Sequence, residues 1–180
     1  MDNVFSQMST KPRHNKLAGL IYYKLSELMW AGKAEVYFES CSLVHYGHQK
    51  EPLSMQLIDA ANISDITKFK NESMYELDSV QPDIMFFMKN KFTHDSRGVR
   101  IAGCPDLIVE VWSTGNTNLH CEMKKILYST SKITEHWYLE QDKNEVTCYL
   151  GEKQLLNQDL REVLKTKDGI EVDLRYLSVK

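Results

Sequence analysis

The chain has 180 residues, of which 42% are hydrophobic and 26% are charged, a composition typical of one ordinary globular domain. Its net charge is −3 and its pI about 6.1, which argues against a protein that coats nucleic acid through bulk positive charge but still allows a local basic groove. No apolar run is long enough to span a membrane, and the N-terminal segment lacks the apolar core of a secretory signal, so we expect a cytoplasmic protein without membrane contact.

The first expected element is a helix from Pro12 to about Gly32. Its apolar residues recur on one face, and the glycine supplies a stop signal. A strand is predicted over residues 35–44, which contain aromatic and β-branched residues. Residues 46–80 are polar and mixed, and we treat them as a candidate insertion within a single domain that covers residues 1–180.

Two segments in the middle of the chain, 83–88 and 106–112, are apolar at nearly every position. Such runs predict strands that are buried on both faces, in the middle of a sheet flanked by helices. A polar loop is expected between them. After these strands we expect a helix over 119–131, a hairpin formed by 135–139 and 145–150, and a last strand near 170–174. The chain is therefore predicted to be an α/β (α+β) domain with a central mixed β-sheet.

The four cysteines are far apart in the sequence and form no close-spaced pair. Structural zinc sites usually take their ligands in such pairs, so we do not expect one. We expect the four thiols to be free packing residues.

Two acids lie within the predicted central strands. Asp83 opens the first strand and Glu110 lies near the end of the second. If these strands are antiparallel neighbours, the two carboxylates converge at one edge of the sheet. Paired carboxylates suit Mg²⁺ or Mn²⁺, and such an ion can polarise a phosphodiester and activate a bound water. Lys124, in the second turn of the following helix, could reach this edge and orient the water or stabilise developing charge.

Two simpler interpretations remain open for the same residues. Asp83 follows a proline and could merely cap the start of a strand. Glu110 has apolar neighbours on both sides and could form a buried ion pair with Lys124. Asp106, which also follows a proline, is interpreted as a structural residue at a strand entry.

The order of motifs resembles the Uma-type putative restriction endonuclease family of the PD-(D/E)XK nuclease superfamily. The resemblance is carried by PDI at 82–84, PDLIVEVWS at 105–113, a lysine and a tyrosine 14 and 18 residues after Glu110, and EHW at 135–137. The opening MSTKPRHNKLAGLI and the closing DGIEVDL are similar to the family's ends. This resemblance implies a restriction-endonuclease-like core and a metal-dependent endonuclease that acts on DNA. Two departures are Trp112 and His120, which stand where a superfamily lysine and a family aspartate are usual.

The resemblance also adds secondary site candidates. These are His14, Glu39, His120 and Tyr128. His14 could equally be a core or cap residue, and Glu39 could face solvent. The polar loop between the central strands could follow a phosphate backbone, although charged loops are usually only solvated. Its candidate nucleic-acid contacts are Lys89, Lys91, Arg97 and Arg100.

Three functional classes therefore stay open at this stage. The first is a Mg²⁺- or Mn²⁺-dependent endonuclease, in which a homodimer could address two strands of DNA. The second is a catalytically inactive relative that binds nucleic acid or a partner protein. The replacement of a family aspartate by His120 favours this class. The third is a structural homo-oligomer, which would leave the converging acids without a purpose.

Overall fold

We describe the protein from a computed structural model of the whole chain. The described residues are 12–38, 42–44, 79–88, 92–94, 100–113, 115–116, 121–122, 124–125, 128–129, 133–151, 153–160 and 162–175.

A six-stranded sheet forms the centre of the molecule. Its order is β1-β4-β7-β8-β9-β10. Only β7 and β8 are parallel among these neighbours, so the sheet is mixed, as the sequence predicts. The strands are β1 (Ala34–Phe38), β4 (Ile84–Met88), β7 (Leu107–Trp112), β8 (Glu135–Glu140), β9 (Glu145–Leu150) and β10 (Lys153–Asp159).

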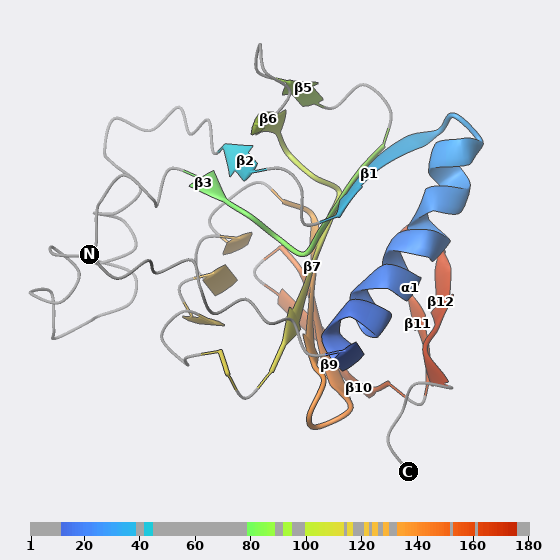
Figure 1. The fold of residues 1–180 in the computed structure, drawn as a ribbon, viewed down its shortest axis with the longest axis vertical. Coiled ribbons are helices and arrows are strands. Elements are labelled where there is room, and N and C mark those ends of the chain that lie inside the picture. The colour runs from blue at the N-terminus through green and yellow to red at the C-terminus, as the bar shows by residue number, and fades with distance from the viewer. Residues whose placement is uncertain are drawn as a thin grey trace, which may run out of the picture.

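One long helix, α1 (Pro12–Trp30), lies across one face of this sheet (Figure 1). Proline suits its first turn, because the ring presets φ and no donor is lost there. The helix ends in a Schellman motif, in which the Gly32 N–H donates to the Met29 carbonyl and the Lys33 N–H to the Leu28 carbonyl, both at 2.9 Å. Gly32 has φ +69°, a left-handed conformation that side chains disfavour. The predicted helix and its stop are therefore confirmed.

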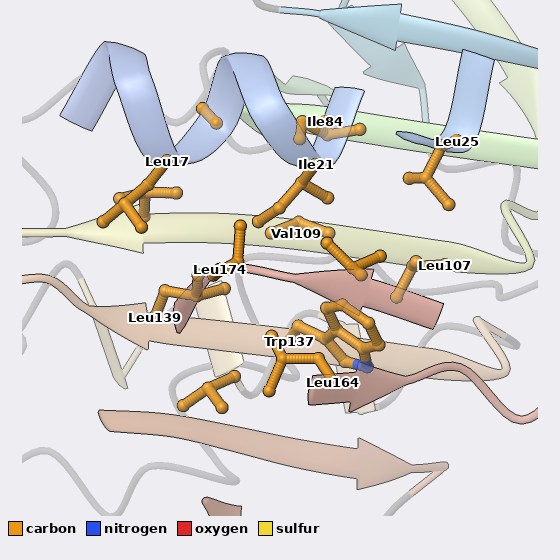
Figure 2. Packing of buried hydrophobic residues seen from close by; sticks show 14 of the residues in the cluster. Leu17, Ile21, Leu25, Ile84, Leu107, Val109, Trp137, Leu139, Leu164 and Leu174 are labelled. Carbon is orange, nitrogen blue, oxygen red and sulfur yellow. The ribbon is translucent and has the colours of Figure 1, made fainter. Parts of the chain in front are cut away.

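The main core lies between α1 and the sheet. Leu17, Ile21 and Leu25 point from the helix toward Val109 on β7 and Trp137 on β8 (Figure 2). A hairpin of β11 (Val163–Lys165) and β12 (Glu171–Asp173) lies beside the helix and adds leucines to the same cluster (Figures 1 and 2). A second apolar cluster, which includes Ile108, Trp112 and Tyr138, covers the other face. Every residue of β7 is buried, which confirms the expectation of a central strand.

The structure corrects two of the sequence-based predictions. Residues 35–44 do not form one strand. Instead β1 joins the central sheet, while β2 (Ser42–Val44) belongs to a separate four-stranded sheet of order β3-β2-β6-β5, seen at the top of Figure 1. The segment expected as a loop between the central strands also contributes to that sheet. The remaining strands are β3 (Ser79–Val80), β5 (Phe92–His94) and β6 (Arg100–Gly103).

The other predicted elements agree with the described part of the chain. The described residues between 121 and 129 are helical, β8 and β9 form the expected hairpin, and β12 matches the last strand. Strands β10 and β11 had not been predicted. The described cysteines, Cys104, Cys121 and Cys148, form no disulfide. Within the described residues, no helix is both long and apolar enough to cross a membrane.

Candidate active site

Asp83 and Glu110 meet at the edge of the central sheet. Strands β4 and β7 are antiparallel, with Ile84 opposite Val109. Asp83, which precedes Ile84, therefore lies beside Glu110, which follows Val109. The convergence that the sequence predicts is therefore present. It follows from register alone, since antiparallel neighbours bring the start of one strand to the end of the other.

The Glu110 side chain is 2% exposed and is held by two residues of the helical segment that follows β7. The Lys124 Nζ donates to both carboxylate oxygens, at 2.8 Å from each. The Tyr128 Oη donates to Oε1 at 2.6 Å. Positions 14 and 18 residues after Glu110 thus reach back to the same carboxylate, because residues four apart share one face of a helix.

Electrostatics link these three side chains. Burial and the nearby Asp83 charge raise the pKa of Glu110, although Lys124 and Tyr128 oppose the shift. Burial alone would lower the pKa of Lys124, but the charge and hydrogen bonds of Glu110 outweigh it and the pKa is raised. Burial and the Glu110 charge raise the pKa of Tyr128 well above its usual range. The lysine therefore stays an ammonium ion and the tyrosine stays a hydroxyl donor.

Asp83 is held from two directions. The Val111 backbone N–H donates to its Oδ2 at 2.6 Å, and the His14 Nε2 lies 3.2 Å from the same oxygen. His14 lies in the first turn of α1, a turn without any acidic side chain. The partial positive charge at a helix N-terminus favours an anion there. The structure thus brings His14 to the site as well.

The chemistry of these donors fits a hard divalent cation. Asp83 and Glu110 offer carboxylate oxygens, which Mg²⁺ and Mn²⁺ prefer, and Mg²⁺ is usually held by one or two carboxylates with waters in the other positions. Within the described residues, no group of three or more His, Cys, Asp and Glu side chains is arranged to hold a metal ion. Among the described residues, Asp83 and Glu110 are the carboxylates that could hold a cation at this edge.

Several predicted site residues lie outside this description. His120 and Glu39 are not among the described residues, and neither are Lys89, Lys91 and Arg97. Arg100 opens β6, but its side chain is not described.

Asp106 has the structural role that was expected. It is 3% exposed, and its Oδ2 accepts the Met88 N–H at 2.8 Å, which ties the end of β4 to the start of β7.

Two backbone groups belong to the site and were missed by the sequence analysis. The Val111 N–H fixes Asp83, and the Gln81 carbonyl accepts a long hydrogen bond of 3.4 Å from the Lys124 Nζ. Backbone groups carry no side-chain signal. Pairing of β4 with β7 does place the Val111 N–H beside Asp83, so a correct register would have suggested that group.

Comparison with known proteins agrees with the family that the sequence predicts. The family model of Uma2, described as "Putative restriction endonuclease", matches residues 58–179. Among solved structures, the chain is similar to a putative nuclease of DUF820 from Anabaena variabilis ATCC 29413, with a TM-score of 0.64 and 12% identity. That match covers 93% of this chain and 82% of the other, so the two share a fold. No curated protein matches.

The fold and the family match together define the class: an α/β protein with a nuclease-type fold. The family model covers well over half of the chain, and the protein therefore belongs to the Uma2 family of putative restriction endonucleases.

Proposed function

We propose that the protein is a divalent-metal-dependent endonuclease that hydrolyses phosphodiester bonds of DNA. The observation that carries this proposal is the meeting of Asp83, Glu110 and Lys124 at one edge of the sheet, with the lysine 2.8 Å from the glutamate. Membership of the family supports nuclease chemistry.

Each of the three residues has a separate role in this proposal. Asp83 and Glu110 would hold Mg²⁺ or Mn²⁺, which supplies Lewis-acid polarisation of the phosphoryl group and a water of lowered pKa. The Lys124 ammonium lies beside the glutamate and can orient the attacking water or neutralise charge that develops on the phosphoryl oxygens. Tyr128 and His14 each hold one carboxylate in place.

Cleavage of supercoiled plasmid in Mn²⁺ tests the proposal. Asp83→Asn and Glu110→Gln keep side-chain shape but remove the charge, and each is expected to abolish cleavage. A matched control is Glu122→Gln. Glu122 is exposed and forms an ion pair with Lys125, so loss of its charge should leave cleavage unchanged. Parental cleavage by either of the first two variants, once folding is verified by circular dichroism, would refute the assignment.

A second candidate function is a catalytically inactive nuclease-fold protein that binds nucleic acid or a protein partner. The observation that favours it is the Lys124 ammonium, which contacts both oxygens of Glu110 and can satisfy that buried charge without any metal. DNA affinity that is the same with Mn²⁺ and with a chelator, together with no cleavage by the parent protein, would support this alternative.

A further inference from the structure

Contacts from the described residues leave one lone-pair position of the Glu110 carboxylate for a cation. An ionised carboxylate offers about four lone-pair positions, two on each oxygen. The Lys124 Nζ is equally far, 2.8 Å, from Oε1 and Oε2, so it occupies the position between the two oxygens. The Tyr128 hydroxyl takes a further position on Oε1. The outer lone pair of Oε2 is what these two residues leave free.

The two oxygens of Asp83 also differ in the contacts that they make with protein donors. Its Oδ2 receives the Val111 N–H at 2.6 Å and lies 3.2 Å from the His14 Nε2. Its Oδ1 receives no hydrogen bond from the part of the chain that the structure describes. Among the described residues, each carboxylate thus has one oxygen with two protein contacts and one with fewer: Oε2 of Glu110 receives only Lys124, and Oδ1 of Asp83 receives no hydrogen bond.

The position held by Lys124 is the one that a cation needs to bind both oxygens of a carboxylate at once. Ca²⁺ commonly takes carboxylates in this two-oxygen mode, because it accepts six to eight ligands in a flexible shell. Mg²⁺, and Mn²⁺ with similar ligand preference, favour an octahedral shell built from single oxygens and waters. An ammonium ion between Oε1 and Oε2 therefore blocks the two-oxygen mode at Glu110, which Ca²⁺ uses more readily than Mg²⁺ does.

We propose that Lys124 is the residue that sets the cation specificity of this site, by restricting Glu110 to coordination through Oε2 alone and so favouring Mg²⁺ and Mn²⁺ over Ca²⁺. This inference rests on the proposed function, since it assumes that Asp83 and Glu110 bind a divalent cation. It goes further by assigning to the lysine a role in metal choice that is separate from any role in hydrolysis.

Calorimetric titrations of the full chain with Mn²⁺ and with Ca²⁺ test this role without relying on activity. Lys124→Met removes the ammonium group, and the ratio of the Kd for Ca²⁺ to the Kd for Mn²⁺ is expected to fall by about tenfold, as for loss of other groups that orient metal ligands. Lys124→Gln serves as a second variant should the methionine variant fold poorly. Its amide can donate to one oxygen but cannot bridge both.

Lys125→Met is the matched control. This lysine is the next residue, pairs with Glu122 at 2.8 Å and lies over the Trp112 ring. Its removal takes away the same charge near the site, which can change both affinities but should leave their ratio unchanged.

The outcomes separate the two proposals. A ratio that stays at the parental value in both Lys124 variants would overturn the specificity role and leave the metal site intact. If neither the parent nor the Lys124 variants bind Mn²⁺ or Ca²⁺, both the specificity role and the metal-dependent function are wrong. A lowered ratio with no detectable DNA cleavage by the parent would support the specificity role and count against the nuclease function.

Discussion

Replacement of Lys124 by methionine should destabilise the protein in a manner that depends on pH. Methionine keeps a long, flexible side chain in the same space but removes the charge that contacts both Glu110 oxygens at 2.8 Å. Breaking a buried ion pair by removing one partner costs about 3–5 kcal/mol, because the other charge stays buried without compensation. Glu110 is 2% exposed, so water cannot take the place of the lysine.

Protonation of Glu110 sets an upper limit to this loss. A carboxyl group with the ordinary pKa of 4.5 is neutralised at pH 7 at a cost of about 1.4 kcal/mol per pH unit, or about 3.4 kcal/mol in total. Because burial already raises the pKa of Glu110 in the folded parent, the cost there is lower. The folded variant takes up a proton on Glu110 when this costs less than burying the unpaired charge, and Tyr128 still contacts the carboxyl group. We therefore expect the free energy of unfolding to fall by about 2–3 kcal/mol at pH 7.

The sign of the pH dependence follows from the raised pKa. A carboxyl group whose pKa is higher in the folded than in the unfolded state contributes stability that is fully present below its unfolded pKa, here near 4.5, and is lost as the pH rises through its folded pKa. Loss of Lys124 raises the folded pKa further. The difference in free energy of unfolding between parent and variant should therefore shrink by at most about 1.4 kcal/mol per pH unit as the pH is lowered from 7 toward 5, because the pKa of Glu110 is also raised in the parent.

Urea unfolding between pH 5 and pH 8, followed by tryptophan fluorescence, measures this difference. Lys125→Met is the control, and because its ion pair with Glu122 is largely exposed, its removal should cost less than about 1 kcal/mol at every pH. The double variant Lys124→Met with Glu110→Gln removes both charges and should lose the pH dependence. A Lys124→Met variant as stable as the parent at pH 7, or equally destabilised at pH 5 and pH 7, would refute this account of the pair.

Three further predictions concern the fold. Ile21→Ala should lower the free energy of unfolding by about 2–5 kcal/mol, because Ile21 is fully buried on the face of α1 that packs against the sheet. Tyr23→Ala, on the exposed face of the same helix, should change it by about 0.5 kcal/mol or less. Equal effects of the two substitutions in urea unfolding would contradict the packing described here. Gly32→Ala should lower the free energy of unfolding by about 1 kcal/mol through the backbone alone, because φ is +69° and an added Cβ would meet no neighbouring atom within 4 Å. An unchanged midpoint of urea unfolding would contradict this backbone cost. Burial raises the pKa of Cys148 to about 12, so its thiol should react slowly at pH 8. An aromatic disulfide reagent should therefore count the same number of fast-reacting thiols in the native parent and in the Cys148→Ser variant; a lower number in the variant would contradict this.

Much of the central architecture was predictable because it depends on local patterns. Continuous apolar runs identified β4 and β7, and their antiparallel pairing brought Asp83 to Glu110. The spacing of 14 and 18 residues placed Lys124 and Tyr128 on one helix face. The glycine at position 32 marked the end of α1 through its backbone freedom alone. Each of these signals lies within a short stretch of sequence and reports a preference of that stretch.

The tertiary structure alone decided the features that depend on which distant segments meet. Residues 35–44 have one continuous strand pattern, yet β1 and β2 belong to different sheets, because strand partners are chosen by packing and not by propensity. The placement of His14 against Asp83 needs α1 to cross the sheet at one particular angle. The position of the Lys124 ammonium, 2.8 Å from both Glu110 oxygens, depends on how the helical segment after β7 packs against the sheet. Sequence thus determined which chemical groups gather at this edge, and the three-dimensional packing determined which of their atoms contact one another.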